Sequence, residues 1–369
     1  MNKIYVIDEP CGKGKTSFAI QMMNNQPDRS YIYCTPFLDE IQRIKNATDI
    51  DISEPQFNGG RKIDDFNKLL MSGTNIALTH STFANSNNET LEYLSEGKYV
   101  LIIDEVLDIL LNFNDICNDD LTKTDIKLLR KEGFIKFDAY GKVYWIKDSY
   151  PTSKYSNVER LAKNGNLYYL DETMLVWQFP AEIFKAFEEV YILTYMFEGS
   201  FLKPYFQYHN IDFQLVGLQK SNNGNYYIGE YSSDIAGREK YKQLITICND
   251  SKLNSYKAHS LSKTWFERQT KADIDKLQSK IYNYFRGKMK AKSKDILWTC
   301  PKKYKNQLKG KGYNIVRRLS AEERALPKRE KERTEKLLSC YAPINARATN
   351  DYSDRSVLAY VYNFTQIHM

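Results

Sequence analysis

Short apolar runs, separated by stretches with helical spacing, divide the first half of this chain. The runs at 4–7, 31–34, 99–103 and 190–193 have the length and composition of buried strands. Residues 17–23 carry apolar side chains at the spacing of a helix that covers a sheet. Continuous apolar strands that alternate with helices are typical of a parallel sheet buried on both faces. The pattern therefore predicts an α/β fold.

A long segment interrupts this alternation between the third and the fourth apolar run. Compact strand-to-strand connections are usually far shorter than the roughly 85 residues found here, so the pattern predicts an insertion over about 106–188. Within it, 134–137 and 143–146 read as one hairpin, and 167–170 and 174–177 as another. Their aromatic residues can form a small core, or they can stack on nucleic-acid bases. The insertion is therefore expected to be rich in β-structure.

A polar stretch, 219–225, is the best candidate for a linker between two domains. The chain then divides into a first domain, 1–218, and a second, basic domain, 219–369. In the second domain the pattern predicts a helix over 272–285, a strand over 295–301 and a charged helix over 320–336 that Pro327 interrupts. A last buried strand is expected over 338–341.

The turn after the first strand matches most of a phosphate-binding loop. The pattern G-x-x-x-x-G-K-[ST] is met at Gly14, Lys15 and Thr16, whereas Glu9 stands at the position of its first glycine. Backbone amides at the start of a helix attract phosphate oxygens. Lys15 would neutralise the β- and γ-phosphates, and the Thr16 hydroxyl would bind Mg²⁺. The alternative is an ordinary turn between strand and helix. The residues expected to hold ATP in this loop are Gly12, Lys13, Gly14, Lys15, Thr16 and Ser17.

Two carboxylates follow the apolar run at 99–103. Asp104 would hold Mg²⁺ through water, and Glu105 would polarise the water that attacks the γ-phosphate. The carboxyl ends of parallel strands are where open α/β sheets bind ligands. The alternative, a helix cap after the strand, explains Asp104 but not its combination with the phosphate loop. Together the two motifs predict an ATPase that uses ATP and Mg²⁺. Thr194, which ends the fourth apolar run, is the candidate sensor of the γ-phosphate.

Charge is distributed unevenly along the chain. Residues 251–340 contain 25 Lys and Arg against 9 Asp and Glu, a net charge of +16, and the remainder has 28 against 37, a net charge of −9. Such a basic segment favours a polyanion, and nucleic acid is the usual one. The alternative is a solvated surface in a lysine-rich protein. The six cysteines show no metal-binding spacing, and no apolar run is long enough for a membrane span. We expect a cytoplasmic protein of a bacterial host cell with no membrane partner.

Five segments taken in order resemble the phage-type branch of the superfamily 2, DEAD-like helicases. They are EPCGKGKT, TPFLDEIQRI, LIIDE, ILT and NARATNDYSDR. The resemblance implies two RecA-like domains with ATP between them, the second of them short or truncated because no later arginine motif follows. It also implies that Arg347 or Arg355 completes the ATP site, although a salt bridge with Asp351 or Asp354 explains either arginine equally well. A protein partner that completes the second domain is a further implication.

These features support three functions. The first is an ATP-dependent nucleic-acid motor, a helicase or translocase that is phage-encoded and acts on DNA rather than RNA. The second is the motor of a DNA-packaging terminase, although the second domain lacks the acidic residues of a nuclease. The third is a regulatory or interaction protein that has kept a nucleotide-binding fold. We expect the motor, with the regulatory protein as the alternative and the terminase motor as a further alternative.

Overall fold

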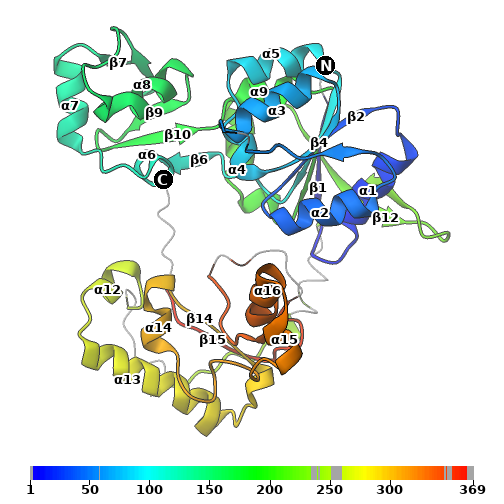
Figure 1. Cartoon of the computed structure of the whole chain (residues 1–369), viewed down its shortest axis with the longest axis vertical. Coiled ribbons are helices and arrows are strands. Elements are labelled where there is room, and N and C mark those ends of the chain that lie inside the picture. The colour runs from blue at the N-terminus through cyan, green and yellow to red at the C-terminus, as the bar shows by residue number, and fades with distance from the viewer. Residues whose placement is uncertain are drawn as a thin grey trace. The chain divides into compact units, whose positions relative to one another are not determined.

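The chain forms two units, Met1–Arg238 and Glu239–Met369. The computed structural model shown in Figure 1 describes residues 3–57, 59–233, 239, 242–250, 260–344, 346 and 351–363. Among these residues, no helix has the length and apolar character needed to cross a membrane.

Unit 1 is built on a sheet of eight strands in the order β13-β12-β1-β11-β5-β2-β4-β3. All neighbouring strands are parallel except β12 and β13, which form an antiparallel hairpin at one edge. The strands are β1 (Lys3–Asp8), β2 (Ser30–Thr35), β3 (Ile52–Ser53), β4 (Asn75–Thr79), β5 (Tyr99–Asp104), β11 (Glu189–Thr194), β12 (Gln214–Lys220) and β13 (Tyr226–Glu230). The α/β fold with a mostly parallel sheet, which the sequence predicted, is therefore confirmed.

Helices cover both faces of this sheet. Successive residues of β5 point to opposite faces, so Leu101 and Ile103 join one core whereas Val100 and Ile102 join the other. Helices α1 and α2 lie on one face, and α3, α4, α5 and α9 lie on the other (Figure 1). The helices are α1 (Lys15–Asn25), α2 (Leu38–Ala47), α3 (Lys62–Met71), α4 (His80–Phe83), α5 (Asn88–Glu96), α9 (Ala181–Lys185) and α10 (Leu202–Tyr208).

The insertion between β5 and β11 contains both strands and helices. Both predicted hairpins are confirmed, because β7 pairs with β8 and β9 pairs with β10 in antiparallel register. Its core, which includes Phe113, Leu129 and Val143, is continuous with one core of the main sheet. The elements are β6 (Leu110–Asn112), α6 (Phe113–Cys117), α7 (Lys123–Lys131), β7 (Ile135–Phe137), β8 (Val143–Trp145), α8 (Ser156–Lys163), β9 (Leu167–Leu170) and β10 (Met174–Gln178).

Unit 2 is a smaller α/β unit around the fully buried Trp298. Its described strands β14 and β15 are parallel, and Tyr341 forms a single bridge to Trp298. A strand was expected over 338–341. Because α16 extends to Leu338, this segment forms only isolated bridges, from Ser339 to Ile315 and from Tyr341 to Trp298. The elements are α12 (Lys263–Glu267), α13 (Lys271–Tyr282), a π-helical turn (Asn283–Lys288), β14 (Ile296–Thr299), α14 (Lys305–Leu308), α15 (Ala321–Ala325), α16 (Lys328–Leu338) and β15 (Val357–Tyr360).

The boundary between the units differs from the predicted one at 218/219. The predicted linker, 219–225, contains the turn of the β12–β13 hairpin, whose strands belong to the sheet of unit 1. Its Ser, Asn and Gly residues indicate a turn, and a turn within a hairpin has the same composition as a linker between domains. Only the pairing of β12 with β1 places this segment in unit 1.

Removal of one buried ring should destabilise unit 1 measurably. Phe184 is fully buried and contacts the rings of Phe179, Tyr205 and Phe206. We expect Phe184→Ala to lower the free energy of unfolding by about 3–5 kcal/mol, because it leaves a cavity in the core. Phe201→Ala is the matched control, since this ring is 52% exposed and its loss should cost less than about 0.5 kcal/mol. Equal losses in denaturant unfolding would contradict the assignment of Phe184 to the core.

Candidate nucleotide site

The candidate site begins at the turn that joins β1 to α1. Gly12 and Gly14 have φ angles of 80° and 93°, which side chains rarely adopt and glycine adopts freely. The amide of Phe18 donates to the carbonyl of Gly14 at 2.8 Å, so the first helical turn closes on this glycine. The turn therefore leads directly into the N-terminus of an eleven-residue helix, the position that anions favour.

Lys15 lies across this turn. Its side chain is buried, and its ammonium group donates to the carbonyl oxygens of Glu9 and of Pro10, the latter at 3.1 Å. These contacts hold the charge beside the backbone of the loop. A phosphate at the helix N-terminus would offer the ammonium a charged acceptor, which forms a stronger hydrogen bond than a carbonyl does.

Glu9, which replaces the first glycine of the pattern, ties the turn to both neighbouring strands. Its carboxylate accepts a hydrogen bond from the amide of Leu218 in β12 at 3.0 Å. Its own amide donates to the carbonyl of Thr194 in β11 at 3.0 Å. The departure from glycine therefore has a structural role, because a glycine could make only the second of these contacts.

The β12–β13 hairpin is fastened to the phosphate loop. Gln21 of α1 and the backbone of Tyr226 exchange two hydrogen bonds of 2.8 Å. A Cβ atom on Gly14 would lie 2.3 Å from the ring of Tyr226, so only glycine fits beneath that ring. The ammonium of Lys220 lies 5.1 Å from the centre of the same ring. No sequence pattern predicts this contact, because the two segments are about two hundred residues apart.

Asp104 ends β5 in a partly desolvated position. Its carboxylate accepts a hydrogen bond of 2.8 Å from the hydroxyl of Tyr33 in β2. Burial is the largest influence on this group and raises the pKa of Asp104 to about 6, although the Tyr33 hydrogen bond acts in the opposite direction. The negative charges of Glu40 and Glu105 add to the increase, and the positive charge of Arg43 reduces it. A bound cation would stabilise the ionised form.

Glu105 takes the chain out of the sheet in a left-handed conformation. Its φ angle is 66°, and its amide still donates to the carbonyl of Leu193 in β11 at 2.9 Å. A non-glycine residue in this conformation costs roughly 1 kcal/mol or more, and such residues cluster at functional sites. The backbone strain therefore falls on the carboxylate that is predicted to be catalytic.

The strand order brings the separate motifs to one edge of the sheet. In the parallel register Asp8 pairs with Thr194, and Leu193 pairs with Asp104. Strand β11 thus lies between the strand that carries the loop and the strand that carries the two carboxylates, which places these two strands about 10 Å apart. The loop residues 12–17, Asp104, Glu105 and Thr194 all lie at this carboxyl edge.

Two further polar groups, Asp8 and Thr35, lie at the same edge, and the sequence motifs did not include Asp8. Asp8 is 7% exposed, and one of its oxygens accepts from the amide of Phe197 at 3.2 Å and from the hydroxyl of Tyr231 at 3.4 Å. Its other oxygen and the hydroxyl of Thr35 have no hydrogen-bond partner among the described residues. Buried polar atoms normally find partners, so these two atoms mark places where a ligand or water would bind. The available signal was the position of Asp8, which ends an apolar strand as Asp104 does.

The residues at this edge suit a Mg²⁺ ion that arrives with a nucleotide. No group of three or more His, Cys, Asp or Glu residues that could hold a metal by itself occurs in the described parts of the chain. In nucleotide sites Mg²⁺ needs only one or two protein oxygens, because water and phosphate oxygens supply the rest. Asp104, with its desolvated carboxylate, and the partly exposed Thr16 can provide those oxygens.

The two arginines expected to complete the site belong to unit 2. Arg347 lies outside the described residues. The side chain of Arg355 is only 4% exposed, and its guanidinium donates to the carbonyl oxygens of Lys294 and of Leu337, the latter at 3.0 Å. It also pairs with Asp354 at 3.4 Å, which is one of the salt bridges that the sequence suggested. As it stands, Arg355 binds groups of its own unit.

The fold and this edge define a two-unit α/β protein with a phosphate-loop-like turn at the carboxyl ends of its parallel strands. Over 380 residues, the chain is 32% identical to the SPbeta prophage-derived uncharacterized protein YonV of Bacillus subtilis (strain 168), covering 98% of this chain and 84% of that protein. Residues 239–368 match the family model of the YonV C-terminal Rossmann-like domain, and residues 116–177 match that of the YonV middle domain. The chain therefore belongs to the YonV family.

This membership corrects the family that the sequence motifs suggested. The assignment to the phage-type superfamily 2 helicases is wrong, because both matching family models are YonV domains. The five segments that carried the resemblance are short, and motifs of this kind recur on many α/β proteins. The second unit is Rossmann-like according to the family model that it matches.

The raised pKa of Asp104 predicts a pH-dependent stability. Because this pKa, about 6, lies above the usual value of 3.8, the folded state binds a proton more tightly than the unfolded state. Stability therefore falls as the pH rises from about 4 to about 6 and stays lower above that range. Asp104→Asn removes the charge and should raise the free energy of unfolding by about 1–3 kcal/mol at pH 7, with little effect at pH 4. Denaturant unfolding at both pH values tests this, with the exposed Asp108→Asn as the control.

Proposed function

We propose that this chain binds ATP with Mg²⁺ at the carboxyl edge of unit 1 and hydrolyses it to act on nucleic acid. One observation carries the proposal: the phosphate-loop-like turn and the Asp104–Glu105 pair flank a single strand, β11, of a parallel sheet. Ligands of open α/β sheets bind at such an edge. The proposal concerns chemistry and does not depend on membership of a helicase family.

Each residue at the edge has a role that its position supports. The amides of the loop and the ammonium of Lys15 bind the phosphates, and Thr16 and Asp104 hold the metal ion. Mg²⁺ supplies charge neutralisation at the β- and γ-phosphates. Glu105 orients the attacking water, and Thr194 lies beside both motifs on β11. Catalysis then consists of positioning and of electrostatic stabilisation of the developing charge.

The action on nucleic acid is the broader part of the proposal. We infer that unit 1 is RecA-like, since its strand order places one strand between the two motifs. We also infer that the enzyme is a motor that acts on DNA in preference to RNA. The basic composition of unit 2 supports a nucleic-acid partner. The similarity to a prophage-derived protein supports a phage origin and a place in the cytoplasm of a bacterial host.

One observation favours a second function, a nucleotide-binding regulator without rapid hydrolysis. The guanidinium of Arg355 is bound to Lys294, Leu337 and Asp354 of its own unit. Without an arginine at the γ-phosphate, phosphoryl transfer in related chemistry is slower by several orders of magnitude. Binding without fast turnover would then serve as a switch.

Cys11 offers a direct test of nucleotide binding, because it lies in the loop and is exposed. In a variant with Cys117→Ser and Cys248→Ser, the remaining described cysteines, Cys34, Cys300 and Cys340, are buried. At a Mg²⁺–ATP concentration ten times the Kd, maleimide labelling of Cys11 should slow about tenfold. Lys15→Ala should abolish this protection, and equal labelling with and without nucleotide would contradict binding at the loop.

Hydrolysis is tested by steady-state ATPase assays without nucleic acid and with single-stranded DNA, duplex DNA or RNA at low salt. We expect stimulation by DNA and a loss of roughly 100-fold or more in Lys15→Ala, because a charge that stabilises the transition state is removed. Lys3→Ala is the control, since Lys3 is an exposed lysine at the amino end of β1, the strand whose other end leads into the loop. Absence of hydrolysis in every arm, with Cys11 still protected, would reject the motor and support the regulator.

A further inference from the structure

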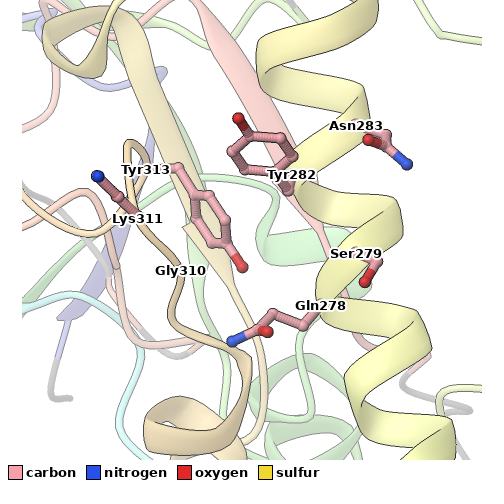
Figure 2. A pocket seen from close by; sticks show the side chains of 7 residues that line it. All are labelled: Gln278, Ser279, Tyr282, Asn283, Gly310, Lys311 and Tyr313. Atoms are coloured by element: carbon pink, nitrogen blue, oxygen red, sulfur yellow. The ribbon is translucent and has the colours of Figure 1, made fainter.

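Unit 2 contains a hollow between α13 and the loop that follows α14. Its volume is about 400 Å³. Figure 2 shows Tyr282 and Gln278 on the side of the helix nearest to the loop, with Tyr313 projecting from the loop. The residues that line it are Gln278, Ser279, Tyr282, Asn283, Gly310, Lys311 and Tyr313. We call it the α13 hollow.

Hydrogen bonds fix the two sides of the α13 hollow. The amide of the Gln278 side chain donates to the carbonyl oxygens of Gln307 at 3.2 Å and Lys309 at 2.6 Å. Tyr313 is fully buried, and its hydroxyl donates to the carbonyl of Leu308. A Cβ atom on Gly310 would lie 2.4 Å from the ring of Tyr313, which explains the glycine at this position. The hollow is therefore a formed feature of the fold.

The α13 hollow lies away from the edge where Rossmann-like sheets usually bind ligands. The hydroxyl of Ser293, just before β14, donates to the carbonyl of Gly312 at 3.0 Å. The loop of the hollow therefore adjoins the amino end of β14, whereas ligands of open α/β sheets bind at the carboxyl ends. We therefore expect the α13 hollow to bind a ligand other than the nucleotide that such sheets usually bind at their carboxyl edge.

An exposed aromatic ring lies at this site, where the geometry of the helix changes. Helix α13 ends at Tyr282 and continues as the π-helical turn Asn283–Lys288. Such turns are rare and occur frequently at functional sites. Tyr282 is 47% exposed, so one large part of its ring is open to solvent beside the hollow. An exposed ring on a helix is a platform on which a nucleic-acid base can stack.

Basic residues are dense in the segment that follows α13 and forms the loop of the α13 hollow. Residues 286–318 contain twelve Lys and Arg and a single acidic residue, Asp295. The side chain of Arg286 lies 3.4–3.7 Å from the position that a Cβ atom on Gly312 would occupy, and its guanidinium donates to the carbonyl of Ala291 at 2.9 Å. Since Ser293 also donates to the carbonyl of Gly312, the segment that carries Lys290 and Lys292 adjoins the loop. Lys290, Lys292 and Lys311 are exposed and form no ion pair with any carboxylate that the structure describes. Their charges are available to a polyanion.

We propose that the α13 hollow binds single-stranded nucleic acid, with a base stacked on Tyr282 and the phosphates bound by Lys290, Lys292 and Lys311. This inference takes the nucleic-acid partner from the proposed function and adds the place on unit 2 where that partner binds. A single strand fits better than a duplex, because its bases are free to stack on a protein ring. The lysines supply the sequence-independent attraction of the phosphates.

The experiment measures binding of a labelled oligo-dT of about 15 nucleotides to the full chain without ATP, by fluorescence anisotropy at several salt concentrations. The triple variant K290A/K292A/K311A is compared with K263A/K271A/K276A, which removes three exposed lysines of α12 and α13 that do not line the hollow. Tyr282→Ala is compared with Tyr282→Phe, which keeps the ring. Cys11 protection by Mg²⁺–ATP is measured in every variant.

We expect Tyr282→Ala to weaken binding roughly 5- to 100-fold and Tyr282→Phe to retain it. The first triple variant should reduce the salt slope by about 2, and the control triple should leave it nearly unchanged. Equal losses in both triples, or wild-type affinity in Tyr282→Ala, would overturn the site, as would duplex DNA bound more tightly than the single strand. Intact Cys11 protection without oligo-dT binding would reject this inference alone. Oligo-dT binding without Cys11 protection would reject only the nucleotide proposal.

Discussion

The parallel ladder of β1, β11 and β5 is the constraint on which the candidate site depends. Its register sets Asp8 beside Thr194 and Leu193 beside Asp104, so three distant segments of the chain end at one edge. The ladder continues past the strands, because the amides of Glu9 and Glu105 both donate to β11. Loss of β11 would separate the phosphate loop from the carboxylates. The insertion between β5 and β11 is therefore compatible with the site, since it leaves the register of both strands intact.

Contacts with the β12–β13 hairpin also hold the phosphate loop in place. The β12–β13 hairpin contacts the loop through Glu9, Gln21 and the ring of Tyr226 above Gly14. These contacts fix a loop whose glycines alone would leave it flexible. Burial of Asp104 works in the opposite direction, because it raises the free energy of the ionised carboxylate in the absence of a cation. A cation bound at this edge, as the proposed function requires, would stabilise the ionised carboxylate.

Membership of the YonV family and the chemistry of the edge describe different properties of the chain. The family follows from similarity over nearly the whole length, whereas the earlier helicase assignment rested on a few short motifs. Motifs of this kind, a turn before a helix and a carboxylate after a strand, can be shared by unrelated proteins. The motifs located a candidate site and misidentified the family. The basic unit 2 adds a second surface, the α13 hollow, that no motif marked.

The sequence by itself determined the α/β class, the buried strands β1, β2, β5 and β11, the two hairpins of the insertion and the places of Lys15 and Asp104 along the chain. These features follow from local apolar patterns and turn residues. Only the tertiary structure decided that 219–225 belongs to a hairpin, that Tyr226 covers Gly14 and that Arg355 is buried in its own unit. The hydrogen bond from Tyr33 to Asp104 was equally hidden. Such contacts join residues far apart in sequence, and their energies depend on packing and burial that no local pattern encodes.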